Sequence, residues 1–429
     1  LSILLNYFCG MDIENKSENE AKAKRSLVFA ITVNIVLLVF FKYFGFLVES
    51  TNTLFGISIP YRELALPIGI SFYTFQEISY IVDVYRGKVK AQQSLVKYAL
   101  YVSMFPQLVA GPIVCYGDIE KQLTARKISG RKLGQGAMLF IIGLSKKAVL
   151  ANTMGKIFEQ ISSTSASSLT VLMAWLGCIT YAFQIYFDFS GYSDMAIGVS
   201  DVLNIELPMN FDSPYKAFSI RDFWKRWHMS LTSFLTEYVY FPLGGSRKGK
   251  IRTYINTMIV FLVSGIWHGA NWTFILWGIL HGILSVVDRL TEKIRKNVHP
   301  ALQWMVTFGI VNVLWLLFRA NSISEWTLMV SHIGALKSMA ISDGLLNVFV
   351  LPETGFLTWL THTTLLYTHV RGFSMLVFFS LAVVLCLGFE NAYRREYRNN
   401  ILSAIGSAVL FVFSLTCIGS ESVFVYFNF

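Results

Sequence analysis

The sequence predicts an all-α protein that crosses a membrane many times. Of its 429 residues, 54% are hydrophobic and only 14% are charged, whereas soluble domains carry roughly 25% charged residues. The mean hydropathy is +0.52. Several apolar runs reach or approach the roughly 20 residues that a helix needs to cross a bilayer. We therefore expect about ten membrane helices, some short or re-entrant, in one membrane domain over residues 1–429.

The apolar runs give the expected helices in chain order. The clearest runs cover residues 26–48, 167–187, 254–267, 272–287, 302–318, 373–389 and 401–419, and weaker ones cover 98–114 and 136–151. The run at 98–114 contains "FPQLVAGPIV", whose prolines and glycine predict a broken helix. Residues 66–85 mix proline, glycines and acids, which indicates a re-entrant or interfacial segment. Residues 210–250 mix charge with aromatic residues, which favours short interfacial helices that dip towards the core.

The basic residues indicate which loops face the cytoplasm. The net charge is +10, and the basic residues gather in loops at 22–25, 121–132, 216–226, 247–252, 289–296 and 394–398. Positive loops on the cytoplasmic side explain this pattern better than nucleic-acid binding, so we expect a lipid bilayer and no nucleic acid as partner. The chain between 252 and 289 must then cross outwards and return. This places His268 in or near the outer half of the membrane.

His268 is the first candidate catalytic residue. It lies in "SGIWHGANW", residues 264–272, with apolar runs on both sides. An ionisable residue inside a membrane segment is costly and is a candidate functional residue. A neutral imidazole accepts a proton and suits a general base. Gly265 and Gly269 leave room for a substrate or for a neighbouring helix. The alternative is a packing histidine with a satisfied hydrogen bond.

Four other histidines have simpler interpretations. His228, in "WKRWHMSL", is either functional or the anchor of a short interfacial helix. His281 is expected to pack between helices. His362 and His369 are seven residues apart, but no carboxylate or cysteine accompanies them at ligand spacing. The five cysteines also lack metal or CxxC spacing. We therefore expect no metal site.

A polar stripe marks the segment "YAFQIYFDFSGYSDMAIG", residues 181–198. Tyr181, Gln184, Asp188 and Tyr192 are spaced by three and four residues, so they share one face of a helix. A carboxylate on such a face points to a protein interior or a wet cavity. The stripe predicts either the wall of a polar substrate tunnel or an interhelical hydrogen-bond network.

Longer motifs carry a resemblance that covers nearly the whole chain. They are "LPIGISFYTFQEISYIVDVYRG", "FPQLVAGPIV", "YFDFSGYSDMAIG", "NFDSPYKAFSIRDFW", "RDFWKRWHMSLTSFLTEYVYFPLGGSRKGK", "SGIWHGANWTFILWGILHG" and "LFRANSISEW". In this order they resemble the membrane-bound O-acyltransferase family, in its bacterial branch that includes the alginate O-acetylation membrane protein. That family has further helices before a segment like "SILLNYFCG". Since the sequence opens at Leu1 without a signal peptide, we expect a truncated N-terminus.

The resemblance implies a funnel-like helical bundle with a central tunnel and short interfacial or re-entrant helices. It implies that His268 is the catalytic histidine and that His228 is the second motif histidine. Asn271, Trp272 and His228 are the candidate donors to a developing oxyanion, with no choice among them, and Asn271 and Trp272 are expected to line the substrate tunnel. The expected acyl donor is acetyl-CoA or an acyl carrier on the cytoplasmic side, with no bound cofactor.

The expected activity is O-acetyl transfer to an exported polysaccharide or cell-wall glycan in a bacterial cytoplasmic membrane, with an extracytoplasmic esterase-like acetyltransferase as partner. Three alternatives stay open: transfer of D-alanine or another acyl group from a carrier protein, transport of an acyl or glycan carrier, and a scaffold for a periplasmic acetyltransferase. No Walker, GxSxG or HExxH motif is present, so nothing in the sequence indicates ATP hydrolysis or a soluble hydrolase. Inverted repeats, which would favour a transporter, are not evident.

Overall fold

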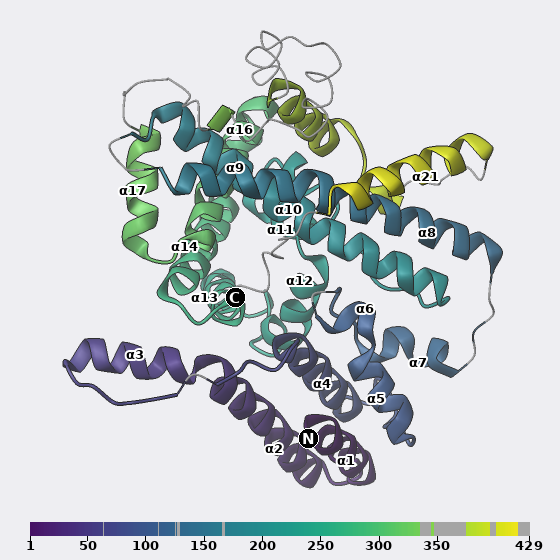
Figure 1. Ribbon diagram of the computed structural model, residues 1–429. Helices are drawn as coiled ribbons and strands as arrows, with labels where there is room; N and C mark the ends of the chain where they lie inside the picture. Colours follow the sequence, from purple (N-terminus) through teal and green to yellow (C-terminus); the bar gives the residue numbers. More distant parts are fainter. Residues whose placement is uncertain are drawn as a thin grey trace.

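The computed structural model describes residues 1–62, 64–109, 111–124, 126, 129–164, 168–334, 345–346, 375–394 and 400–418. Within these ranges the protein is helical and contains no strand (Figure 1). Five helical segments in these ranges are long and apolar enough to cross a membrane: Glu20–Phe55, Gly130–Ser162, Val171–Val202, Trp272–Leu290 and Pro300–Arg319. Two shorter apolar helices cover Met375–Gly388 and Ile401–Thr416. The protein is therefore a multi-pass membrane protein, with fewer long spans in the described ranges than the ten expected.

The helices follow one another in this order. The first half contains α1 (Ser2–Asn15), α2 (Glu20–Leu38), the π-helix η1 (Val39–Tyr43), α3 (Phe44–Phe55), α4 (Ile70–Tyr85), α5 (Leu95–Ser103), α6 (Phe105–Leu108), α7 (Tyr116–Thr124), α8 (Gly130–Ser145), the π-helix η2 (Lys146–Ala151), α9 (Asn152–Ser162) and α10 (Val171–Val202). The second half contains the 3-10 helix η3 (Pro214–Lys216), α11 (Ile220–Arg226), α12 (Met229–Leu235), the π-helix η4 (Thr236–Tyr240), α13 (Lys250–His268), α14 (Trp272–Leu290), α15 (Glu292–Arg295), α16 (Pro300–Arg319), α17 (Ile323–Gly334), η5 (Val384–Gly388), η6 (Ala392–Arg394) and α21 (Ile401–Thr416).

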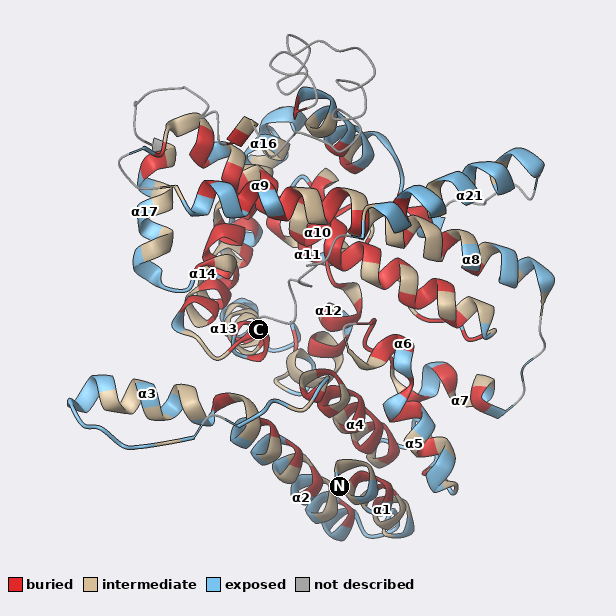
Figure 2. Cartoon of the chain, in the orientation of Figure 1, coloured by how far each residue is buried: buried red, intermediate tan, exposed pale blue. Residues whose placement is uncertain are grey.

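Helix α10 forms the centre of the protein. Of the five spanning segments it has the largest buried share, 67% of its most apolar window, whereas Glu20–Phe55 has 28%. Figure 2 shows this difference, with α10 largely red and α3 pale blue and tan. Thr170 caps α10 by accepting a hydrogen bond from the backbone N–H of Met173. A helix that is buried to this extent belongs to the core rather than to the lipid-facing surface.

Helices α8 and α10 pack in close contact through glycines. A Cβ atom on Gly143 would lie 2.5 Å from the carbonyl oxygen of Gly191, and one on Gly136 would lie 2.4 Å from that of Gly198. The contacts run in opposite directions along the two helices, so the helices are antiparallel. Small residues allow such close backbone approach between membrane helices.

Helices α13 and α14 form a second close antiparallel pair. A Cβ atom on Gly265 would lie 2.4 Å from the carbonyl oxygen of Phe274, and one on Gly278 equally close to that of Phe261. Gly269, in the turn between them, faces the Phe274 ring, which would be 2.2 Å from an added Cβ atom. The glycines of the "SGIWHGANW" segment therefore make room for the neighbouring helix. This pair fixes the end of α13, where His268 lies.

Two of the irregular segments agree with expectation. The run at 98–114 is broken into α5 and α6, with Pro106 in the first turn of α6. Residues 210–250 form the short helices α11, α12 and η4. Their aromatic residues lie deeper than a position at the membrane boundary implies, because Trp224 and Trp227 are only 7% and 1% exposed. These short helices contribute to the core around α10.

Candidate active site

The fold brings the two motif histidines together. His228 and His268 are 40 positions apart in the sequence, and their ring centroids are 6.5 Å apart. His228 is 1% exposed and His268 is 5% exposed. His228 immediately precedes α12, whereas His268 is the last residue of α13. Two buried imidazoles in one place are a candidate centre for proton transfer.

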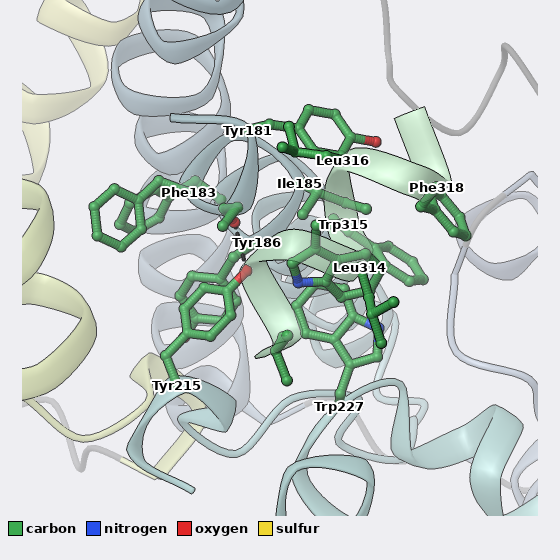
Figure 3. Close-up of a cluster of buried hydrophobic side chains, with 14 of the residues drawn as sticks. Tyr181, Phe183, Ile185, Tyr186, Tyr215, Trp227, Leu314, Trp315, Leu316 and Phe318 are labelled. Carbon is green, nitrogen blue, oxygen red and sulfur yellow. Dashed lines mark hydrogen bonds between the residues drawn. The ribbon is translucent and has the colours of Figure 1, made fainter. Parts of the chain in front are cut away.

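His268 lies in a shell of aromatic rings. Its ring is in edge contact with Trp267 at 5.0 Å, Trp277 at 5.3 Å and Phe318 at 5.1 Å between centroids. Trp315 contacts both Trp277 and Phe318. It continues this cluster to Trp227, as Figure 3 shows for Phe318, Trp315 and Trp227. Such a shell excludes water around the imidazole, which strengthens every electrostatic interaction that a bound substrate makes there.

Asn210 determines which nitrogen of His228 carries a hydrogen. The Oδ1 atom of Asn210 accepts hydrogen bonds from the backbone N–H of Ser230 at 3.2 Å and from its hydroxyl at 2.9 Å. The same oxygen lies 3.0 Å from Nδ1 of His228. Because a backbone N–H only donates, the amide atom that faces it is the oxygen, and Nδ1 of His228 must donate. In the neutral ring Nε2 is then the acceptor nitrogen.

Local backbone geometry explains how Asn210 reaches His228. His228 has a left-handed conformation, with φ of 45°, so the chain turns sharply between α11 and α12. Two backbone hydrogen bonds then join the turn to the segment before η3, from Asp212 N–H to Arg226 O and from Met229 N–H to Asn210 O. Sequence reasoning did not single out Asn210. Its signal was available, since Asn210 opens the quoted "NFDSPYK" motif.

Asn271 and Trp272 have structural contacts of their own. Asn271 caps α14 by accepting a hydrogen bond from the N–H of Thr273 at 3.0 Å, and its amide donates to the carbonyl of Asn321 at 3.0 Å. Trp272 is 55% exposed, and its ring contacts Phe46 of α3. Both residues are near His268 in sequence, but these contacts occupy the Asn271 side chain and direct the Trp272 ring to α3. Their place in a substrate tunnel stays a prediction.

The polar stripe of α10 faces α9 and η2. Tyr181 is fully buried, and its ring packs against Phe158 of α9. Gly155 leaves room for the Gln184 amide, which would lie 2.7 Å from a Cβ atom there. Asp188 forms an ion pair of 2.5 Å with Lys147.

Tyr192, the fourth member of the stripe, is half-buried. The Asp188 pair and the two α9 contacts favour the interhelical network over the tunnel wall. The tunnel assignment of Tyr181, Gln184, Asp188 and Tyr192 stays a prediction.

A cavity of about 680 Å³ opens near His228. Its walls come from α4, α7, α12, η4 and the segments beside them, and it is lined by Asp83, Lys88, Val89, Ile113, Cys115, Gly117, Asp118, Pro208, Met209, Met229, Ser230, Ser233, Phe234, Glu237 and Tyr238. Ser230 belongs both to this lining and to the Asn210 network. Tyr238 donates to Asp83 at 2.7 Å, and burial raises the pKa of the nearby Cys115 thiol to about 11. The hydrogen bond from Ser230 in the cavity wall to Asn210 therefore connects the cavity with the residue that orients His228.

Three other histidines were considered in the sequence, and the structure describes one of them, His281. His281 accepts a hydrogen bond from Nε1–H of Trp224 at 3.1 Å, which supports the expected packing role. His362 and His369 lie outside the described residues.

The fold is that of a multi-pass membrane protein with two histidines side by side in its interior, and the comparisons specify its class. The family model described as "MBOAT, membrane-bound O-acyltransferase family" matches residues 90–324, which include both histidines. The chain belongs to the membrane-bound O-acyltransferase family and is an O-acyltransferase.

Three relatives show the range of similarity. A peptidoglycan O-acetyltransferase of Helicobacter pylori is 35% identical over all of this chain and 86% of its own length. A probable alginate O-acetylase of Azotobacter vinelandii is 38% identical, over 82% of this chain and 74% of its own. A teichoic acid D-alanyltransferase of Bacillus subtilis is 29% identical, over 59% of this chain and 67% of its own.

Proposed function

We propose that the protein transfers an acetyl group from a cytoplasmic donor to hydroxyls of an exported polysaccharide or cell-wall glycan, with His268 as general base. The observation that carries this proposal is the buried His268 ring, held beside His228 in an aromatic shell. The acetyl group is favoured because the relatives named for O-acetyl transfer match more of this chain, at 35% and 38% identity, than the D-alanyltransferase at 29%. Family membership also favours an enzyme over a transporter or a scaffold.

The proposed reaction needs one base and one thioester. A hydroxyl is a weak nucleophile near neutral pH unless its proton leaves as it attacks. The neutral imidazole of His268 takes that proton while the hydroxyl oxygen forms a bond to the thioester carbonyl. The carbon–sulfur bond then breaks, and the proton passes from His268 to the leaving thiolate. The reaction releases an ester and a thiol and needs no metal or redox cofactor in this scheme.

His228 suits a supporting role in this scheme. Its Nδ1–H is directed to Asn210, so its other ring nitrogen is an acceptor rather than a donor. This disfavours His228 as the donor to an oxyanion and favours it as a second proton acceptor or an orienting group. The hydrogen bond to Asn210 favours this tautomer of the neutral His228 ring.

The cavity beside Ser230 suits the entry of the donor. It borders α7, whose last turn begins the basic segment 121–132, and η4, which precedes the basic segment 247–252. Both segments are expected on the cytoplasmic side. Acetyl-CoA and an acidic acyl carrier are both anionic, so either donor is attracted by the basic loops. We propose a bacterial cytoplasmic membrane, with an extracytoplasmic esterase-like acetyltransferase as a partner on the other side.

Substitution of His268 tests the proposal. His268→Ala and His268→Gln should lower the acetate ester content of the exported glycan by at least about a hundredfold, the lower range for loss of a general base. Membrane abundance should stay normal. His281→Gln is the matched control, because glutamine keeps an acceptor for Trp224 at another buried histidine position. Normal acetylation by His268→Ala at normal abundance would remove His268 from the mechanism.

A further inference from the structure

The end of α13 is held by two consecutive residues of a distant helix. Lys42 of η1 donates from Nζ to the carbonyl oxygens of Trp267 at 2.6 Å and His268 at 3.1 Å. Tyr43, the next residue, donates from its hydroxyl to the carbonyl of Ile266 at 2.6 Å. The last four carbonyl groups of a helix have no partner within that helix. Three of these four groups in α13 thus receive a donor from η1.

The chemistry of this contact suits a fixed helix end. The protonated form of Lys42 has three hydrogens, and Lys42 also donates to the hydroxyl of Ser71 at 3.2 Å, so this form has an acceptor for each hydrogen. Positive charge at a helix C-terminus interacts favourably with the helix dipole. Hydrogen bonds from a charged donor are also shorter and stronger than neutral ones. The carbonyl of Ser71 in turn accepts from Nε1–H of Trp267, so α4 joins the same contact.

The position of Lys42 in the sequence argues for more than packing. It lies inside the apolar segment Glu20–Phe55, where a lysine is costly and usually serves a function. The π-helical turn Val39–Tyr43 contains both Lys42 and Tyr43. Single π-helical turns of this kind are frequent at functional sites. Lys42 contacts the backbone carbonyl of His268, whereas the His268 ring packs against Phe318.

We propose that Lys42 is a positioning residue for His268, which holds the final turn of α13 so that the imidazole stays at a fixed place beside His228. This inference rests on the proposed function, since it assigns a role through the general base. Without the ammonium group the carbonyls of Trp267 and His268 lose their donors and the last turn frays. A catalytic group displaced by about 1 Å loses on the order of a hundredfold in rate.

Lys42→Met tests the inference, because methionine keeps an unbranched apolar stem and removes every donor. Acetate ester on the exported glycan, per folded membrane protein, should fall at least tenfold. Lys42→Arg should recover part of this loss, since it restores a cation with donors. Tyr43→Phe removes one hydrogen bond from a carbonyl two residues before His268, so a loss of no more than about threefold is expected.

A control separates positioning from general destabilisation. Gly143→Ala disturbs the α8–α10 contact, away from the η1–α13 contact, and should lower the melting temperature in detergent while activity per folded protein stays near normal. If the activity of Lys42→Met per folded protein stays within twofold of the parent, or if Gly143→Ala loses as much activity per folded protein for an equal fall in melting temperature, the positioning role is wrong. Should Lys42→Met fail to accumulate, Lys42→Gln, which removes the ammonium group and shortens the side chain, decides: activity per folded protein within twofold of the parent contradicts the inference, and a larger loss at the melting temperature of the parent supports it.

His268→Ala, measured in the same assay, distinguishes a failure of the proposed function from a failure of the positioning role of Lys42. An active His268→Ala protein overturns the proposed function itself. An inactive His268→Ala protein beside a fully active Lys42→Met protein overturns only the role of Lys42.

Discussion

Asp188 of α10 and Lys147 of η2 form an ion pair 2.5 Å long, with Asp188 buried. A neighbouring pair, Asp194 and Lys146 at 2.6 Å, joins the same two elements. Consecutive lysines thus meet two carboxylates that are six residues apart on α10. Breaking a buried pair by removing one charge leaves the other uncompensated, at a cost of about 3–5 kcal/mol.

The two pairs allow a matched test of the tunnel prediction. Asp188→Asn and Asp194→Asn should each lower the melting temperature, because each leaves a lysine without its carboxylate. If Asp188 serves only as a link between helices, the two variants lose activity in parallel with stability. A loss of transfer by Asp188→Asn that exceeds that of Asp194→Asn by about tenfold at equal melting temperature would instead place Asp188 in the substrate path.

Asn210 should matter to transfer through its single acceptor oxygen. Asn210→Leu removes the acceptor for His228 and Ser230, and we expect a loss of at least tenfold in acetate transfer. Asn210→Asp keeps an acceptor at this position and should retain much more activity. The measurement is acetate ester per membrane protein for both variants. Equal activities of the leucine and aspartate variants would show that the tautomer of His228 does not matter.

The cavity can be probed through its own cysteine. In a variant that keeps only Cys115, labelling with a bulky maleimide should abolish transfer, and acetyl-CoA or an acyl carrier should slow the labelling. Below a pKa of about 11, each pH unit raises the thiolate fraction about tenfold, so labelling should be about ten times faster at pH 9 than at pH 8. A variant that keeps only Cys9, on α1, is the control and should stay active after labelling. Full activity of completely labelled Cys115 protein would exclude the cavity as the donor route.

The contact between η1 and α13 also predicts topology. Helices α2 and α13 both begin next to basic residues. Helix α2 continues into η1, where Lys42 contacts His268 at the far end of α13. Cysteines placed at Arg126 and Lys248 in a cysteine-free protein should therefore resist an impermeant thiol reagent on intact cells. A cysteine at Thr53, in α3 beyond this contact, should react. Rapid outside labelling at Lys248 would reverse the orientation and with it the cytoplasmic donor.

The sequence predicts the membrane class and several helix boundaries. It does not predict which distant residues meet, because those contacts depend on how the helices pack. Apolar runs and the prolines of "FPQLVAGPIV" predicted the membrane class and the break between α5 and α6. The resemblance identified His228 and His268 as motif histidines, but their proximity was not predicted, because no local pattern joins residues 40 positions apart. The stripe of α10 was identified correctly as a helix face. Its partner Lys147 was not predicted, because periodicity shows which residues share a face and not which helix covers it.

The same limit applies to Asn210 and Lys42. Asn210 reaches His228 through a turn with a left-handed residue, and Lys42 reaches α13 from more than 200 positions away. Neither contact has a spacing rule, because each depends on how separately formed helices dock. The glycines of α13 show the same point: the sequence allowed a substrate or a helix beside them, and the structure places α14 there.

The hold of η1 on α13 bears on how small an active protein can be. The family match begins at residue 90, yet Lys42, Tyr43 and Ser71, which secure the end of α13, all precede it. A protein shortened to residues 90–324 would keep both histidines and lose the hydrogen bonds from Lys42 and Tyr43 to the end of α13. On the proposed role of Lys42, the smallest working unit of the enzyme is larger than the region by which its family is identified, and designs for shortened or chimeric enzymes need to carry the α2–η1 segment with them.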